Sequence, residues 1–138
     1  MEKKILDLPL KKEWYTMIDS GVKTEEYREL KPYWCNRLLY FTTLGVKEYW
    51  EDILRKTILT VSKISFLDFN KMLIKQYGTR GYTHVRFRYG YTKKTMLFEI
   101  KSISIGKGNK EWGAPDDDVF IIKLGEKIDE SIHDRLAN

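Results

Sequence analysis

The sequence predicts a single domain of the mixed α+β class. The chain has 138 residues, 42% of them hydrophobic and 14% aromatic, which is enough for one core of ordinary size but not for two. Apolar residues recur with helical spacing through much of residues 10–77, whereas residues 82–125 show the alternation and β-branched content of strands. No repeat, low-complexity segment or linker divides the chain, so residues 1–138 are expected to form one domain.

A strand and a helix are expected first. Residues 5–8, ILDL, predict a short strand that ends at Pro9. The next apolar residues fall at i, i+4, i+7 and i+8, which predicts a helix, and Gly21 stands where a left-handed C-cap ends one. The apolar positions of this helix are Leu10, Trp14, Met17 and Ile18. Residues 23–30 alternate imperfectly and predict an extended segment, and Pro32 suits the first position of a short helix.

The middle of the chain predicts two further helices. Residues 46–58 carry apolar side chains at i, i+3, i+4, i+7, i+8 and i+12. Residues 66–77 follow Ser65 as a suitable N-cap and stop at Gly78. Residues 57–65, TILTVSKIS, have the β-branched content of a strand. Four large side chains on the helical stripes are expected in the core: Trp14, Trp50, Phe66 and Met72.

The remainder of the chain predicts sheet. Residues 84–89, HVRFRY, alternate between polar and apolar, and residues 89–95 predict a turn. In the long strand that follows, the apolar positions switch parity, which predicts a bulge near Lys101–Ser102. A glycine-rich loop then leads to residues 119–125, VFIIKLG, a strand expected to be buried on both faces. Residues 129–138 predict at most a short surface helix.

Basic residues outnumber acidic ones along the chain. Lys and Arg number 25 against 20 Asp and Glu, for a formal charge of +5. The excess lies in residues 41–100, which hold 11 basic and 5 acidic side chains. Such a region favours a polyanionic partner, nucleic acid first, although a generic basic surface has the same composition.

The cysteine and histidine content limits the chemistry further. The single cysteine, Cys35, allows no internal disulfide and suits a reducing compartment, so a cytoplasmic location is expected. With only His84 and His133 besides, no Cys/His zinc spacing exists, and neither a metal nor a cofactor is expected. No apolar run has the length of a signal peptide or a membrane span, so no membrane partner is expected either.

A cap glycine is followed by three ionisable residues in the pattern G-x-K-x-x-E-x-R. The four positions are Gly21, Lys23, Glu26 and Arg28. A lysine and an arginine that flank one carboxylate hold it ionised and supply two cationic donors, which suit a phosphate or the polar edge of a base. In a dry pocket the same groups suit acid–base chemistry. The alternative is a solvated cluster of surface ion pairs, which stabilises a protein little.

This pattern resembles the motif of the ASCH family, whose members are small PUA-like barrels related to RNA-binding modules. Four fixed positions recur by chance on the order of once in a thousand chains of this length. The context also agrees, because the family's motif follows an N-terminal strand and helix, and EWGAP with VFIIKLGE resembles the C-terminal part of some members. The resemblance covers residues 1–34 and 82–126. It implies a small PUA-like β-barrel with peripheral helices and with the motif side chains in its cleft; residues 41–80 do not align and are expected to form a helical insertion.

Two further groups of residues are candidates for ligand binding. Arg86 and Arg88 project from one face of their strand beside His84 and suit a phosphate backbone, or they serve solubility. Three tyrosines near this strand suit base stacking: Tyr82, Tyr89 and Tyr91. Trp112, in the polar loop, is a candidate lid over a base, or it folds back onto the core.

The first function that these observations favour is binding of nucleic acid, most plainly RNA, with a nucleotide or base held in the barrel cleft. In this hypothesis Lys23 and Arg28 contact phosphate or base acceptors, and Glu26 orients them or accepts from a base amine. Gly21 shapes the cleft by ending the helix. The other ligand-binding candidates are Arg86, Arg88, Tyr82 and Trp112.

The second function is a small amidohydrolase that acts on N4-acylated cytidine or a similar modified nucleoside. One branch of the family is understood to use the motif lysine with a threonine nucleophile for this reaction. Lys23 matches that lysine, but Glu26 occupies the position of the threonine and Thr24 lies two residues earlier. The catalytic candidates are therefore Lys23, Thr24 and Glu26, with Glu26 as a general base for water. Another RNA-processing hydrolase, or a protein partner bound through the helices of residues 41–80, also stays open.

Overall fold

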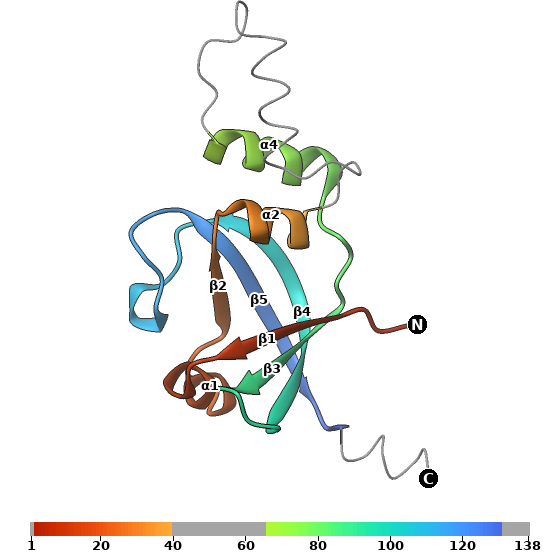
Figure 1. Ribbon diagram of the computed structural model, residues 1–138, viewed down its shortest axis with the longest axis vertical. Helices are drawn as coiled ribbons and strands as arrows, with labels where there is room; N and C mark the ends of the chain where they lie inside the picture. The colour runs from red at the N-terminus through yellow and green to blue at the C-terminus, as the bar shows by residue number, and fades with distance from the viewer. Residues whose placement is uncertain (1, 40–65, 131–138) are drawn as a thin grey trace, which may run out of the picture.

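A computed structural model describes residues 2–39 and 66–130 as a five-stranded mixed sheet with three helices (Figure 1). The strands are β1 (Ile5–Leu10), β2 (Glu25–Glu29), β3 (His84–Tyr89), β4 (Thr95–Gly106) and β5 (Val119–Ile128). The helices are α1 (Lys12–Asp19), α2 (Pro32–Leu38) and α4 (Phe66–Tyr77), and a 3-10 turn, η1, spans Lys110–Trp112. The predicted α+β class is therefore confirmed for these residues.

The sheet is curled into half a barrel. Its strand order is β1-β3-β4-β5-β2, with β1 parallel to β3 and every other pair antiparallel. The first two strands of the chain are thus the two edges of the sheet. Figure 1 shows α1 at one end of the curl, close to the ends of β1 and β3, and α2 with α4 stacked beyond the other end. The curl leaves a seam between the edge strands β1 and β2.

The core fills the concave side of the sheet. In β3 the alternation seen in the sequence separates the two faces of the strand. Val85 and Phe87 are fully buried, while Arg88 is exposed. Leu6 and Leu8 of β1 lie beside them, and β5 contributes Phe120. The helices add a second set of buried side chains: Tyr15, Ile18, Cys35, Leu38, Phe69 and Leu73.

Several predicted elements are confirmed with small shifts. The bulge predicted at Lys101–Ser102 corresponds to register shifts between β4 and β5 from Phe98 to Ser102. Pro32 is the first residue of α2, as predicted, and residues 66–77 form α4. The strand predicted to end at Pro9 instead continues to Leu10. Proline is tolerated there because β1 is an edge strand whose outer N–H groups have no ladder partner.

Two predicted core residues are corrected. Met72 is 43% exposed on α4, and Trp14 is half-buried and lines a pocket instead of the core. Phe66 does pack against the core. The helix predicted at 46–58 with its Trp50, the strand at 57–65 and most of the tail at 129–138 lie outside the described residues, so the proposed insertion is described only for α4.

Candidate functional site

The end of α1 sets the direction of Lys23. Gly21 has a φ of +85°, and its N–H donates to the Ile18 carbonyl while the N–H of Lys23 donates to the Met17 carbonyl. A Cβ at Gly21 would meet nothing within 4 Å, so the glycine is needed for its backbone conformation and not for space. The chain therefore turns back over the helix end and sends the Lys23 side chain inward, where it is 2% exposed.

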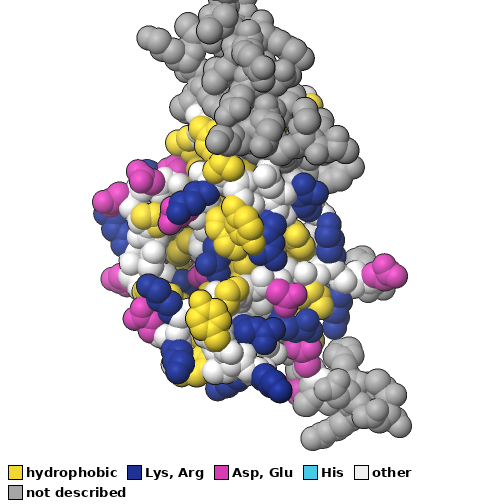
Figure 2. All heavy atoms as spheres, viewed as in Figure 1, with side chains coloured by type: hydrophobic (Ala, Val, Ile, Leu, Met, Phe, Trp, Pro, Cys, Tyr) yellow, Lys and Arg dark blue, Asp and Glu magenta, His cyan; other side chains and the backbone are white. Residues whose placement is uncertain are grey.

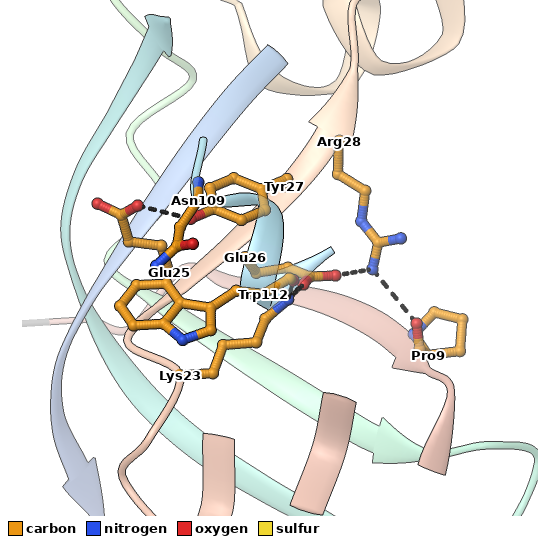
Figure 3. A network of polar contacts seen from close by, with 8 residues as sticks. All are labelled: Pro9, Lys23, Glu25, Glu26, Tyr27, Arg28, Asn109 and Trp112. Carbon is orange, nitrogen blue, oxygen red and sulfur yellow. Dashed lines mark hydrogen bonds and ion pairs between the residues drawn. The ribbon is translucent and has the colours of Figure 1, made fainter. Parts of the chain in front are cut away.

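The three ionisable side chains of the motif converge. Lys23 Nζ lies 3.0 Å from Glu26 Oε1, and Arg28 Nη2 lies 2.9 Å from Glu26 Oε2. Figure 3 shows the three side chains in a row that continues to the carbonyl of Pro9, which accepts from Arg28 at 3.3 Å. Lys23 also donates to the carbonyl of Trp112. The fold thus brings these three side chains together, which the sequence alone could not establish.

The cluster is buried and carries an excess positive charge. The Glu26 side chain is 7% exposed and that of Arg28 is 20% exposed. Burial lowers the pKa of the Arg28 guanidinium, although Glu26 beside it acts in the opposite direction. Within the described part of the chain, the buried Nε of Arg28 has no hydrogen-bond partner. Two cations and one carboxylate, with a donor left over, favour an anion or a carbonyl oxygen as ligand.

Aromatic rings form walls around these charges. Lys23 Nζ lies 4.7 Å from the ring centre of Trp14 and 5.2 Å from that of Tyr27, within the range of cation–π attraction. These residues and Trp112 line a pocket of about 350 Å³, which extends to the end of β1 at Leu10 and Lys11. That volume lies near the lower bound of ligand pockets, roughly 300–1,000 Å³. The pocket therefore suits a small planar group better than a bulky one.

The loop that carries Trp112 is fixed by Tyr27. The Tyr27 hydroxyl donates to Glu25 Oε1 at 2.8 Å and accepts from the N–H of Asn109 at 2.9 Å (Figure 3). Burial raises the pKa of Tyr27 to about 12, so the phenol remains a donor at neutral pH. Gly113, with a φ of +95°, lies against the Trp14 indole, where a Cβ would come within 2.9 Å of the ring. The two sides of the pocket thus contact each other directly.

Not every predicted site residue belongs to this pocket. Thr24 and Arg88 are exposed, Tyr82 and Arg86 are half-buried, and none of the four lines the pocket. Arg86 pairs with Glu130 at 2.8 Å and lies 3.9 Å from Asp7. Arg88 is exposed and donates to the Thr92 carbonyl. The Trp112 side chain packs on the small cluster around Tyr27, which matches the alternative that it folds back, and its backbone carbonyl accepts from Lys23.

Sequence reasoning missed an arginine–tryptophan stack beside the pocket. Arg28 lies 5.0 Å and Arg37 lies 5.4 Å from the ring centre of Trp34. Arg37 donates to the carbonyl of Asp7, as Arg28 does to that of Pro9, so both arginines bridge the seam from the β2–α2 side to β1. Helical spacing of Trp34 and Arg37 at i and i+3 was the available signal.

The described residues were also compared with the requirements of a metal site and of a membrane span. Across residues 2–39 and 66–130, no three His, Cys, Asp or Glu side chains gather as metal ligands. No helix of this part of the chain is both long enough and apolar enough to cross a bilayer. No family model, curated protein or solved structure matches the chain.

Proposed function

We propose that this domain is an RNA-binding module of the ASCH type, built on a PUA-like half-barrel, whose motif pocket holds one base of a single-stranded RNA. The observation that carries the proposal is the buried Lys23–Glu26–Arg28 cluster at the base of an aromatic-walled pocket. A base has a flat apolar face and a polar edge, and the pocket offers a partner for each. The same pattern of residues supports the kinship with the ASCH family.

The free hydrogen-bonding groups define what the pocket accepts. Arg28 uses Nη2 for Glu26 and Pro9, which leaves Nη1 to donate to a base carbonyl or a phosphate oxygen. Each Glu26 oxygen has one further lone pair for a base amine. Trp14 and Trp112 provide the faces against which the ring stacks. A pyrimidine or purine that presents both an acceptor and a donor at its edge satisfies this set.

Binding is better supported than covalent catalysis. Lys23 Nζ already contacts Glu26 Oε1, the Trp112 carbonyl and two aromatic rings, so its N–H groups are directed at the protein and not at a ligand. Thr24 is exposed and does not line the pocket, which leaves it poorly placed as a nucleophile toward a ligand held there. We therefore place hydrolysis of N4-acylated cytidine, and of RNA itself, second.

Fluorescence anisotropy with a labelled twelve-nucleotide single-stranded RNA of mixed sequence tests the proposal. We expect binding at 50 mM salt that weakens as salt rises, because phosphate contacts release counterions. Arg28→Gln and Lys23→Met each remove one pocket cation and should raise Kd at least about tenfold, which corresponds to about 1.4 kcal/mol. Lys101→Gln, on the exposed face of β4, changes the net charge equally and should alter Kd less than about twofold.

The proposal is wrong if the wild-type protein does not bind the RNA at low salt, or if Arg28→Gln and Lys23→Met bind as well as the wild type. Circular dichroism and thermal melts of each variant separate loss of binding from loss of folding. Incubation with N4-acetylcytidine addresses the alternative. Release of cytidine above the Lys23→Met control would replace binding with hydrolysis as the function of the pocket.

A further inference from the structure

A second group of cations lies next to the pocket, where α1 begins and the β3–β4 turn folds against it. We call Lys11, Lys12, Arg88, Lys93 and Lys94 the hairpin patch. Figure 2 shows basic side chains gathered at the lower end of the molecule, where Figure 1 places α1 and this turn. Five positive charges on two short segments make a strong local potential.

The hairpin patch brings together five cations whose charges are not neutralised. Six surface cations elsewhere do form ion pairs with carboxylates: Lys31, Lys71, Arg86, Lys107, Lys110 and Lys127. Within residues 2–39 and 66–130, none of the five patch residues has a carboxylate within 4 Å. Unpaired cations crowded together repel one another, so a polyanion that screens them is favoured.

The hairpin patch is continuous with the pocket. Lys11 belongs to both, since it lines the pocket and precedes the first residue of α1. Leu10, also in the pocket wall, pairs with Tyr89 of β3, and its carbonyl accepts from the N–H of Gly90 in the turn. Paired strands lie about 4.8 Å apart. The turn is therefore one strand spacing away from the pocket rim, within the reach of the next nucleotides of a chain.

Aromatic rings lie among these cations. The ammonium groups of Lys12 and Lys94 each lie 5.3 Å from the ring centre of Tyr89. Tyr91, at the tip of the turn, is fully exposed. A free aromatic face among lysines is the arrangement with which proteins bind single strands, by stacking on bases while cations contact phosphates. It is a less suitable arrangement for a folded protein partner, whose interfaces are depleted in lysine.

We infer that the hairpin patch binds the phosphate backbone of the nucleic-acid strand whose base enters the pocket. The ligand is then an oligonucleotide and not a free nucleoside or mononucleotide. This inference rests on the proposed function, which places one base of the strand in the pocket. The two nevertheless make separate predictions. The pocket determines which base is bound, and the hairpin patch determines how affinity depends on length and salt.

The test compares two triple variants of equal charge. Lys12→Gln/Lys93→Gln/Lys94→Gln changes the hairpin patch, and Lys75→Gln/Lys101→Gln/Lys123→Gln changes three exposed lysines outside both the pocket and the patch. Anisotropy with the twelve-nucleotide RNA is measured from 50 to 300 mM salt. Binding of the four nucleoside 5′-monophosphates is followed by tryptophan fluorescence, because two pocket walls are tryptophans.

We expect the patch variant to bind the RNA at least tenfold more weakly at 100 mM salt. The slope of log K against log salt should fall by about 2, since each phosphate contact on a single strand contributes about 0.7. Its affinity for mononucleotides should match that of the wild type within twofold. The control triple should lose less than threefold in RNA affinity with nearly the same slope.

Three results would overturn the inference. The first is an equal loss in both triple variants, which would indicate general charge attraction. The second is an unchanged salt slope in the patch variant. The third is patch-dependent cosedimentation with phosphatidylserine vesicles without RNA binding, which would assign the patch to membranes. If Arg28→Gln binds RNA normally while the patch variant does not, the proposed base pocket fails and the backbone surface stands.

Discussion

Glu26 is the residue on which the site depends. Its carboxylate lies between the buried Lys23 and the partly buried Arg28 and bonds one with each oxygen. A buried charge that loses its partner costs far more than the pair contributes in net stability. The arrangement therefore makes the three residues a unit, in which the effect of each change depends on the other two.

We expect Glu26→Gln to destabilise the domain by about 3–5 kcal/mol, because Lys23, 2% exposed, then lies unpaired beside Arg28. Lys23→Met should cost less, since Glu26 keeps its contact with Arg28. The double variant Lys23→Met/Glu26→Gln should recover part of the lost stability, with a coupling free energy between the two positions of about 1–3 kcal/mol. Urea unfolding of the four proteins measures this cycle. Additive losses would show that Lys23 and Glu26 do not interact energetically.

The sequence was sufficient to select the charged residues of the site but not its walls. The spacing from Gly21 to Arg28 identified the cluster, because a helix end and a short strand determine where those side chains lie. Trp14 was wrongly predicted in the core, since a tryptophan on an apolar stripe has the same pattern whether it faces a core or a pocket. Only the position of the loop at Gly113 distinguishes the two.

At the scale of elements, the loop between β4 and β5 decides whether the pocket has a second wall. It carries Trp112, and it is held to β2 through Tyr27 and Asn109. Gly108 lets the loop approach this closely. A Cβ there would lie 2.6 Å from the Ala114 Cβ and 2.7 Å from the Tyr27 ring, closer than real contacts allow.

Gly108→Ala should therefore destabilise the protein by about 1–3 kcal/mol, the usual cost of overpacking, and weaken RNA binding by displacing Trp112. Gly106→Ala is a matched control in the same segment, because its Cβ would make an ordinary contact of 3.7 Å with Ile121. Thermal melts and anisotropy on both variants measure the effects. Equal behaviour of the two would mean that the loop does not need the close approach.

Local sequence patterns predicted the individual helices and strands better than they predicted which strands pair with each other. The strand at His84–Tyr89 and the helix at Phe66–Tyr77 follow from periodicity alone. The parallel pairing of β1 with β3 joins segments about 80 residues apart, which no local pattern encodes. The extension of β1 through Pro9 depends on its place at the sheet edge, and that place is set by the pairing.

At the scale of the whole molecule, long-range contacts decide which cations are paired with carboxylates. The composition gives only the total charge. Arg86 was predicted to contact phosphate, yet Glu130 and Asp7, which lie far from it in the sequence, neutralise it. The patch cations at the β3–β4 turn remain unpaired within the described residues. Composition could indicate a polyanionic partner, but only the fold shows which cations are left to bind it.

Cys35 reports on the integrity of the whole fold. It is fully buried between α2 and the sheet, and burial raises the pKa of its thiol to about 12. At pH 8 we expect a thiol reagent to label it at least about a thousandfold more slowly than in the unfolded chain, because the folded state dominates by that factor or more. Labelling kinetics across a urea series provide the measurement. Rapid labelling without urea would show that α2 opens on its own.

The seam between β1 and β2 also bears on self-association. The outer edge of β1 exposes carbonyl groups that a strand of another molecule can pair with, which is a route to aggregation. Pro9 has no N–H to offer there, and its carbonyl and that of Asp7 are occupied by Arg28 and Arg37. The arginine assigned to the ligand therefore also caps an edge strand. We therefore expect loss of Arg28 to favour self-association as well as to weaken ligand binding.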